Sequence, residues 1–354
     1  MVEALELRNY RSYASLELDL EPGIVLAVGP NGAGKTNLLE SLHMAAQGFS
    51  PRTRVDAQVI RFGEEGARVA VEGEHGGSPL AVEVTLRLGE AKRARLNGAP
   101  LRAAEELRSR LPTLVFTPDR LAVVKGGPAV RRAYFDRTLG RLFPSRAATS
   151  TEYAAALAQR NGALRRLAAG QSTQEALEPW THRIAEVGTQ LVAARRGLIE
   201  LLSPAFAEIA SELRLGAGDL RYAGEDPTAE ELERRLEQDL ARGSTGLGPH
   251  LHDIAVTAGG RDLRSFGSQG EQRLAVLTLL LAEAELLAQR GEPSPLLLLD
   301  DVLSELDPER RLILAGRLRR AGGQALLTAT TAEALPVTPD ELVEVRPGEA
   351  RRAA

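Results

Sequence analysis

Residues 29–36 read GPNGAGKT, which fits the pattern G-x-x-x-x-G-K-[ST]. Glycines in such a loop let main-chain N–H groups turn inward onto phosphate oxygens, and the start of a following helix adds partial positive charge. We expect Lys35 to reach the β- and γ-phosphates of a nucleotide and the hydroxyl of Thr36 to ligate Mg²⁺. The residues predicted to contact the nucleotide are Gly29, Asn31, Gly32, Ala33, Gly34, Lys35, Thr36 and Asn37.

A second candidate site is the pair of acids that ends the run LLLLDD at 296–301. A strand that is apolar on both faces is typical of the middle of a parallel sheet, and ligands bind at the carboxyl ends of such strands. Asp300 is expected to hold Mg²⁺ or its water, and Asp301 to orient or deprotonate an attacking water. Two adjacent acids could also mark a solvated strand end, but the phosphate loop upstream favours the metal site.

A third candidate is a second start of a helix, within FGSQGEQR at 266–273. The Ser268 hydroxyl, the N–H of Gly270 and the helix dipole all favour an anion. Ser268 followed three residues later by Glu271 is also a capping-box pattern, which needs no ligand. The two interpretations are compatible until a nucleotide binds.

The elements that must carry these residues follow from hydrophobic periodicity. LELRNYRSYASLELDL at 5–20 alternates apolar and polar residues, as half-buried strands do, and GIVLAV at 23–28 is a buried strand that ends at the glycine loop. The segments 67–73, 80–88 and 92–101 predict an antiparallel meander with a tight turn at Asn97-Gly98. PTLVFTP at 112–118 predicts another strand. After residue 295, strand and helix alternate again.

Between about residues 129 and 213 the period becomes that of helices. Apolar residues spaced by three and four form a seam of about three heptads from Trp180 to Leu201, and an earlier helix with Tyr153 and Leu164 could pack on it as an antiparallel hairpin. A helical subdomain that buries its own seam is the favoured interpretation, with a partner-binding coil as the alternative. We therefore predict three segments: 1–125, a helical arm over 126–243, and 244–354, in which the α/β pattern returns.

Composition limits the class of protein. The 354 residues include no cysteine and have a net charge of −4, so disulfides and thiolate metal sites are excluded and a uniformly basic nucleic-acid binder is not expected. No apolar run approaches the length of about 20 residues that a membrane span needs, and no signal-peptide core follows Met1. The sequence therefore predicts a cytoplasmic protein with no membrane partner.

Several motifs together resemble a known family. FGSQGEQR resembles the signature motif of ABC-type ATPases, and SELD at 304–307 resembles their D-loop. With LELRNYRSYASLELDL, GPNGAGKTNLLESLH, VVKGGPAVRRAYFDRTL, GPHLHD and LLLLDDVLSELD, these motifs are similar to those of the RecF family of recombination mediators, in the same order over residues 5–307. In GPHLHD, Leu251 and His252 depart from the family pattern and only His250 and Asp253 match. The strand end LTATT, with Thr328 and Thr330, stands where transport ATPases have a switch histidine.

The resemblance implies a fold and a function. The fold would be α/β, an ABC-type ATPase head with a P-loop core sheet and an antiparallel meander, into which a helical arm is inserted. RecF-like proteins dimerise around ATP, bind duplex DNA near single-strand gaps and junctions, and with RecR and RecO help to load RecA, while weak, DNA-stimulated ATP hydrolysis resets the dimer. Signature residues would contact ATP held by the other subunit. The resemblance thus adds contacts with ATP from Ser268, Gly270, Gln272 and Asp307, and makes Asp301, Lys35 and Ser268 the catalytic group.

Two other functions remain possible: the head of another SMC-like DNA-repair ATPase and, less favoured, an ABC transporter ATPase subunit. The long separation of signature and phosphate loop argues against the transporter, and the short arm argues against a long coiled-coil ATPase. DNA contacts are predicted from local basic patches, each of which could also be an ordinary solvated charge run. The predicted DNA-binding residues are Arg52, Arg54, Lys92, Arg93 and Arg95.

Overall fold

The computed structural model describes residues 1–101, 104–117, 121–290 and 294–353. It divides into two compact units, which we call the head unit, Met1–Arg120 with Val276–Ala354, and the arm unit, Leu121–Ala275. The division falls inside one helix, α10 (Gln269–Gln289). In the part of the chain that the structure describes, no helix combines the length and apolar character that a membrane crossing requires.

The core sheet of the head unit contains the strands that carry the predicted nucleotide site. Its strand order is β15-β14-β3-β13-β12-β8, and all neighbours are parallel except β14 and β15. The interior position predicted for LLLL is confirmed, because β12 pairs with β13 on one side and with β8 on the other. The strands are β3 (Ile24–Val28), β8 (Thr113–Phe116), β12 (Leu296–Leu299), β13 (Ala325–Ala329), β14 (Glu341–Arg346) and β15 (Glu349–Arg352).

The second sheet of the head unit contains the predicted antiparallel meander, β4 to β7, together with β1 and β2, in the order β2-β1-β4-β5-β6-β7. Its long strands bury alternate residues, as their sequence period requires, and Asn97 and Gly98 both have positive φ at the turn between β6 and β7. The strands are β1 (Val2–Tyr10), β2 (Tyr13–Asp19), β4 (Gly66–His75), β5 (Ser78–Arg87), β6 (Arg93–Leu96) and β7 (Ala99–Pro100).

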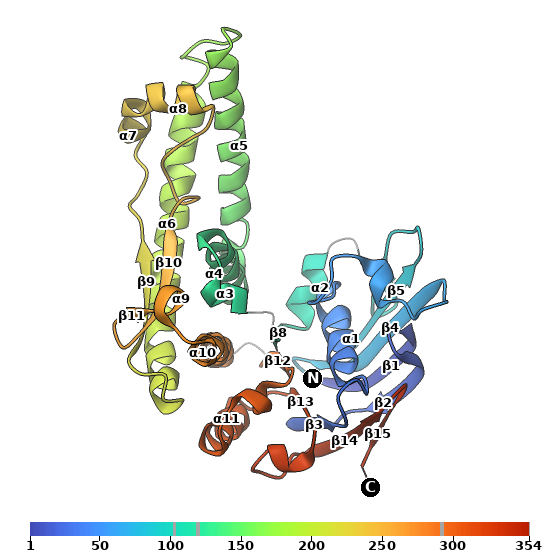
Figure 1. Cartoon of the computed structure of the whole chain (residues 1–354). Helices are drawn as coiled ribbons and strands as arrows, with labels where there is room; N and C mark the ends of the chain where they lie inside the picture. Colours follow the sequence, from blue (N-terminus) through green and yellow to red (C-terminus); the bar gives the residue numbers. More distant parts are fainter. Residues whose placement is uncertain (102–103, 118–120, 291–293, 354) are drawn as a thin grey trace. The chain divides into compact units, whose positions relative to one another are not determined.

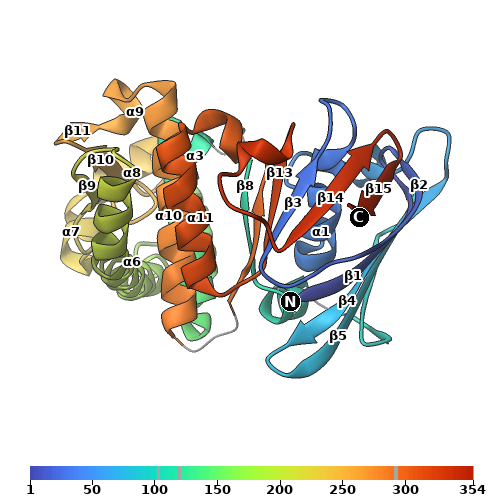
Figure 2. The ribbon, with the colours of Figure 1, turned by 90° about the horizontal axis from the view of Figure 1, so that it is seen from below.

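Helix α1 (Lys35–Gln47) lies between the two sheets of the head unit (Figure 1). Its residues Leu38, Leu39 and Leu42 are buried in one hydrophobic core that includes residues from both sheets. Figure 2 shows α10 and α11 side by side, and an ion pair of 2.5 Å joins Arg317 of α11 to Glu285 of α10. The remaining helices and 3-10 turns of the unit are η1 (Asp56–Val59), α2 (Ala104–Arg110), η4 (Val302–Glu305), α11 (Pro308–Ala321) and η5 (Ala332–Ala334).

The arm unit is built on a pair of long helices, α5 (Thr149–Ala168) and α6 (Glu178–Glu212), which lie side by side (Figure 1). Tyr153 and Ala156 of α5 share a buried cluster with Ile184, Val187 and Leu191 of α6, so the seam is buried within the chain itself. The other elements are α3 (Ala122–Lys125), α4 (Pro128–Leu142), η3 (Pro144–Arg146), β9 (Gly218–Ala223), α7 (Ala229–Arg234), α8 (Leu236–Arg242), β10 (Asp253–Ala258), β11 (Arg261–Asp262) and α9 (Leu263–Phe266).

The arm unit extends beyond the boundary expected at residue 243. Residues 244–275 lie with the arm and not with the head. The reason is a hydrogen-bonded ladder: β10 pairs antiparallel with β9 over six residues, from Asp253 opposite Ala223 to Ala258 opposite Gly218. A short strand of this kind gives no sequence signal of its pairing partner, because the partner lies more than 30 residues away along the chain.

Candidate functional site

The glycine loop follows β3 and leads directly into α1, as the motif predicts. Gly34 has φ +114°, and a Cβ on it would lie 2.9 Å from Ser12 Oγ. A Cβ on Gly29 would lie 2.1 Å from the carbonyl oxygen of Val345. Both positions therefore require glycine, one for its backbone conformation and both for space. Asn31 and Gly32 are exposed, whereas Ala33 is buried beneath the loop.

The Lys35 side chain lies within the curve of this loop. Its Nζ donates to the carbonyl oxygens of Gly29 at 2.7 Å and Pro30 at 3.0 Å. Burial lowers the pKa of Lys35, and the nearby carboxylates of Asp301 and Asp300 oppose that change. A cation held among main-chain groups next to two acids is suited to the phosphates of a nucleotide.

Asp300 joins the loop to the end of β12. Its Oδ1 accepts hydrogen bonds from Thr36 Oγ1 at 3.0 Å and from Thr328 Oγ1 at 2.8 Å. Burial raises the pKa of Asp300, while the two threonine hydroxyls lower it and the neighbouring Asp301 raises it further. The two residues predicted to hold the metal, Thr36 and Asp300, are thus in direct contact.

These oxygen ligands fit Mg²⁺, which binds proteins through one or two carboxylates together with substrate phosphates and water. Among the residues that the structure describes, no group of three or more His, Cys, Asp or Glu side chains could hold a metal ion. A magnesium ion at this position would therefore depend on Thr36, Asp300 and the nucleotide itself. Bound there, it would neutralise developing charge on the phosphates.

Asp301 turns the chain away from β12 into η4. It has a left-handed backbone conformation with φ 51°, and its N–H donates to Thr328 Oγ1 at 2.8 Å. Its side chain is exposed, close enough to Lys35 to influence the pKa of the ammonium group. Further along, Asp307 is the N-cap of α11 and accepts from the N–H of Arg310 at 2.9 Å.

The turn between β1 and β2 was not predicted to belong to the site, yet it lies against the glycine loop. Asn37 Nδ2 donates to Ser12 Oγ at 3.0 Å, and Tyr13 OH donates to the carbonyl oxygen of Gly34 at 3.1 Å. The polar residues Arg11 and Ser12 interrupt the apolar alternation and so indicate a turn. Nothing in that pattern indicates what the turn contacts.

The second helix start lies in the arm unit at the beginning of α10. Ser268 and Glu271 form the predicted capping box: Glu271 N–H donates to Ser268 Oγ at 3.2 Å, and Ser268 N–H donates to Glu271 Oε2 at 2.7 Å. Ser268 and Gly270 are exposed, and a Cβ on Gly270 would have no neighbour within 4 Å. Gln272, in contrast, is buried and donates to the carbonyl oxygen of Leu263 at 2.9 Å, so its side chain stabilises the arm unit and is not directed at a ligand.

The GPHLHD loop at 248–253 is held within the arm unit by hydrogen bonds. His250 Nε2 lies 3.0 Å from the carbonyl oxygen of Thr245, so this nitrogen carries the proton and Nδ1 accepts from Tyr153 OH at 2.6 Å. His252 Nδ1 lies 2.7 Å from Tyr222 OH. The two histidines therefore tie the loop to α5 and β9, which is a structural role.

The predicted DNA-binding residues lie in the head unit, and three of the five contact acids. Arg52 lies 3.5 Å from Glu40, Lys92 3.1 Å from Asp56, and Arg93 2.9 Å from Glu90. Arg54 and Arg95 are exposed. The ion pairs reduce the positive potential of these patches, so Arg54 and Arg95 are the better candidates for contact with phosphate.

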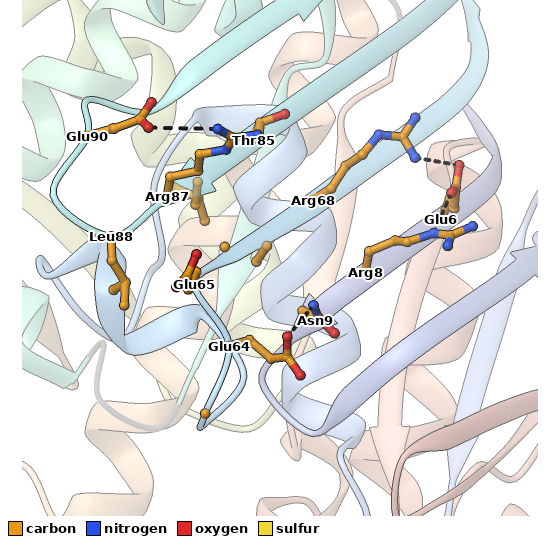
Figure 3. A pocket seen from close by; sticks show the side chains of 14 residues that line it. Glu6, Arg8, Asn9, Glu64, Glu65, Arg68, Thr85, Arg87, Leu88 and Glu90 are labelled. Atoms are coloured by element: carbon orange, nitrogen blue, oxygen red, sulfur yellow. Dashed lines mark hydrogen bonds and ion pairs between the residues drawn. The ribbon is translucent and has the colours of Figure 1, made fainter.

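A wide depression of about 1060 Å³ lies on the outer face of the meander (Figure 3). Several of its charged side chains pair with one another: Arg68 contacts Glu6 at 2.7 Å, and Arg87 lies 3.8 Å from Glu90. The neutral amide of Asn9 donates to Glu64 Oε2 at 3.0 Å. None of the residues of the glycine loop or of the acidic pair lines it. The depression is therefore distinct from the candidate nucleotide site.

Nearly the whole chain is similar to proteins of a known family. The family described as RecF/RecN/SMC N terminal domain matches residues 1–353. The chain is 36% identical over 354 residues to the DNA replication and repair protein RecF of Heliobacterium modesticaldum, covering 96% of this chain and 95% of that protein. It is 38% identical over 347 residues to the RecF of Myxococcus xanthus, covering 92% and 90%. The chain belongs to the RecF family.

Solved structures of similar proteins have the same fold. The recombination mediator protein RecF-ATP of the RecFOR pathway is 28% identical, with a TM-score of 0.85, and the match covers 100% of this chain and 97% of that one. An Smc head domain from Pyrococcus furiosus, crystallised with the C-terminal domain of ScpA, is 18% identical with a TM-score of 0.62, covering 99% and 95%. The predicted ATPase-head fold with an inserted helical part is confirmed.

Proposed function

We propose that this RecF-family chain is an ATP-dependent recombination mediator. It binds ATP and Mg²⁺ in the head unit, dimerises when ATP is bound, and binds duplex DNA near single-strand gaps and junctions. With RecR and RecO it helps to load RecA. The observation that carries the proposal is the contact of 3.0 Å between Thr36 of the glycine loop and Asp300 of β12, because it joins a phosphate cradle to a metal-binding acid.

The roles of the head-unit residues follow from their chemistry. Main-chain N–H groups of the loop bind the phosphates, and Lys35 supplies the positive charge. Asp301, exposed beside Asp300, orients the attacking water or accepts its proton. The family resemblance adds that ATP hydrolysis is weak, is stimulated by DNA and resets the dimer.

The proposed dimerisation rests on the polar groups exposed at the start of α10. Ser268 and Gly270 expose a hydroxyl and a main-chain N–H at the beginning of a 21-residue helix. A hydroxyl and an N–H at the start of a helix favour the binding of an anion. By the family resemblance, this anion is the γ-phosphate of ATP held by a second copy. Asp307, exposed at the start of α11, would contribute to the same shared site. The contact of Gln272 with Leu263 does not support a role for its side chain there.

DNA binding is proposed to be electrostatic and to involve Arg54 and Arg95, with a smaller contribution from Arg52, Lys92 and Arg93. The net charge of −4 means that contacts must come from local patches, and two copies in a dimer double the number of patches. Aromatic residues make up only 4% of the chain, so a platform that stacks the bases of single strands is not expected.

The proposal is tested by sedimentation velocity with and without ATP·Mg²⁺ and a fluorescent duplex. We expect a monomer without nucleotide, a dimer with ATP, and co-sedimentation of the duplex with the dimer. A single-stranded oligonucleotide of equal length is the matched control and should bind more weakly. A chain that stays monomeric with ATP, or binds duplex equally with and without it, contradicts the proposal.

A further inference from the structure

Thr328 lies at the carboxyl end of β13, beside the acidic pair. In the parallel register Leu327 lies opposite Leu299, so Thr328 is level with Asp300 on the neighbouring strand. Its side chain is buried, with 1% of its surface exposed. The hydroxyl donates to Asp300 Oδ1 at 2.8 Å and accepts from the N–H of Asp301 at 2.8 Å. One oxygen atom therefore contacts both acids of the pair.

We infer that Thr328 is the positioning residue for Asp300 and Asp301, fixing the carboxylate of the first and the main chain of the second. A hydroxyl has one proton and two lone pairs, so it can donate to Asp300 and accept from Asp301 at the same time. Valine has nearly the same shape but neither function. This inference rests on the proposed function, because it concerns the same nucleotide site.

The contact with Asp301 offsets a backbone cost. A non-glycine residue is uncommon in the left-handed region, and Asp301 has φ 51°. If its N–H lost the Thr328 acceptor, the main chain would be free to relax, and the carboxylate would turn with it. The hydrogen bond therefore determines where the Asp301 side chain lies.

The contact with Asp300 has a separate purpose. Asp300 Oδ1 accepts from both Thr36 and Thr328. Thr36 is expected to ligate Mg²⁺ through a lone pair when the nucleotide binds, so the position of its hydroxyl, which donates to Asp300, then depends on the metal. Thr328 is not a predicted metal ligand, so its hydroxyl stays bonded to Asp300 and holds the carboxylate in place. Thr330 and Thr331, the other threonines at this strand end, are exposed and do not occupy this buried position.

The test uses three variants of the full chain. Thr328→Val removes the donor and the acceptor, Thr328→Ser restores the hydroxyl, and Thr113→Val is the matched control. Thr113 is also buried, on β8 of the same sheet, but its hydroxyl donates only to the carbonyl oxygen of Leu111 at 2.9 Å. ATP affinity is measured by calorimetry in EDTA and across a Mg²⁺ series, together with kcat and KM for ATP hydrolysis.

We expect Thr328→Val to bind ATP in EDTA within about twofold of the original chain, because the loop is intact. The increase in affinity that Mg²⁺ produces should fall by about tenfold, and kcat should fall by at least about tenfold while KM changes less. Thr328→Ser should recover both to within about threefold, and Thr113→Val should match the original chain. If the valine variant does not fold, as judged by thermal unfolding, Thr328→Ala replaces it.

Three results overturn the inference: an unchanged response to Mg²⁺ and unchanged kcat in Thr328→Val, an equal loss of affinity with and without Mg²⁺, or no recovery in a folded Thr328→Ser. Each would show that the hydroxyl does not act through the acids. If the original chain itself does not bind ATP, the proposed function fails, and the inference fails with it. The ATP affinity of the original chain in EDTA distinguishes failure of the proposed function from failure of the inference alone.

Discussion

The side-chain amide of Gln324 bonds both main-chain polar groups of Val2. Its Nε2 donates to the carbonyl oxygen of Val2 at 2.7 Å, and its Oε1 accepts from the Val2 N–H at 2.8 Å. The same Nε2 donates to the carbonyl oxygen of Glu21 at 2.9 Å. Gln324 directly precedes β13 of the core sheet, whereas Val2 begins β1 of the meander. One buried side chain thus joins the two sheets between which α1 lies.

Gln324→Leu should therefore destabilise the head unit by about 2–4 kcal/mol, because it removes the side-chain partner of three main-chain groups, of which the two of Val2 are buried. Denaturant unfolding followed by circular dichroism measures the effect. Gln289→Leu, at the exposed end of α10, is the control and should change stability by less than about 0.5 kcal/mol. Equal midpoints for the two variants would exclude this role of Gln324.

Lys35→Met should weaken ATP binding by about tenfold to hundredfold or more. The substitution removes the cationic side chain that donates to the loop carbonyls of Gly29 and Pro30 and that we expect to bind the phosphates. Calorimetry with ATP measures the loss, with thermal unfolding as the check on folding. Undiminished affinity in a folded variant would contradict the assignment of the loop.

Asp300→Asn should behave differently from Lys35→Met. The loop and its main-chain donors remain, so affinity for ATP in EDTA should change by no more than about threefold. The gain in affinity on adding Mg²⁺ should be lost, because an amide oxygen is a weaker ligand than a carboxylate. An equal decrease with and without Mg²⁺ would count against a metal-binding role.

Ser268→Arg should leave ATP binding by the monomer intact but prevent ATP-dependent dimerisation. Loss of the cap costs about 1 kcal/mol, whereas the bulky cation obstructs the entry of a second copy's phosphate. Mixing this variant with Lys35→Met provides the decisive control, since each heterodimer can form one intact shared site. Partial recovery of ATPase activity is expected. A mixture as inactive as its components, with heterodimers shown to form, argues against shared sites.

Stability should depend on pH through His252. Burial, with the charges of Arg195, His250, Arg132 and Arg196, lowers the pKa of His252 to about 4. Unfolded histidine titrates near 6.5, so between pH 6.5 and 4 the unfolded chain binds more protons and stability falls as pH falls. Above pH 6.5 His252 is neutral in both the folded and the unfolded chain, so its contribution to stability no longer changes with pH.

The measurement is the thermal midpoint of the original chain and of His252→Gln, whose amide can still accept from Tyr222. Between pH 7 and pH 4.5 the original chain should lose about 2–4 °C more than the variant, after allowance for solvent screening of a half-exposed ring. Identical pH dependence in both chains would show that His252 does not carry the effect.

Duplex binding should depend on salt through Arg54 and Arg95. Each phosphate contact contributes about 0.9 to the slope of log affinity against log salt, so replacing both arginines by glutamine should reduce the slope by about two for each copy of the dimer that contacts the duplex. Arg346→Gln, an exposed arginine on β14, is the matched control. A slope unchanged by the double substitution would remove these residues from the DNA-binding surface.

Local patterns in the sequence determined much of this fold. GPNGAGKT is a contiguous motif in which glycine backbone freedom and the start of a helix act within eight residues, so its position between β3 and α1 could be predicted. The same holds for the alternating strands of the meander and for the capping box at Ser268, whose partner lies three residues away. Interactions of short range leave a signal in the order of residues.

Contacts between distant segments were decided only by the tertiary structure. Thr328 meets Asp300 because two parallel strands bring them level, and Gln324 meets Val2 across 322 positions. Arg52 and Lys92, which are predicted to bind DNA, pair with acids that no sequence period connects to them. Residues 244–275 belong to the arm unit because β10 pairs with β9. Hydrogen bonds and ion pairs depend on which groups come within about 3 Å, and packing of the whole chain determines that distance.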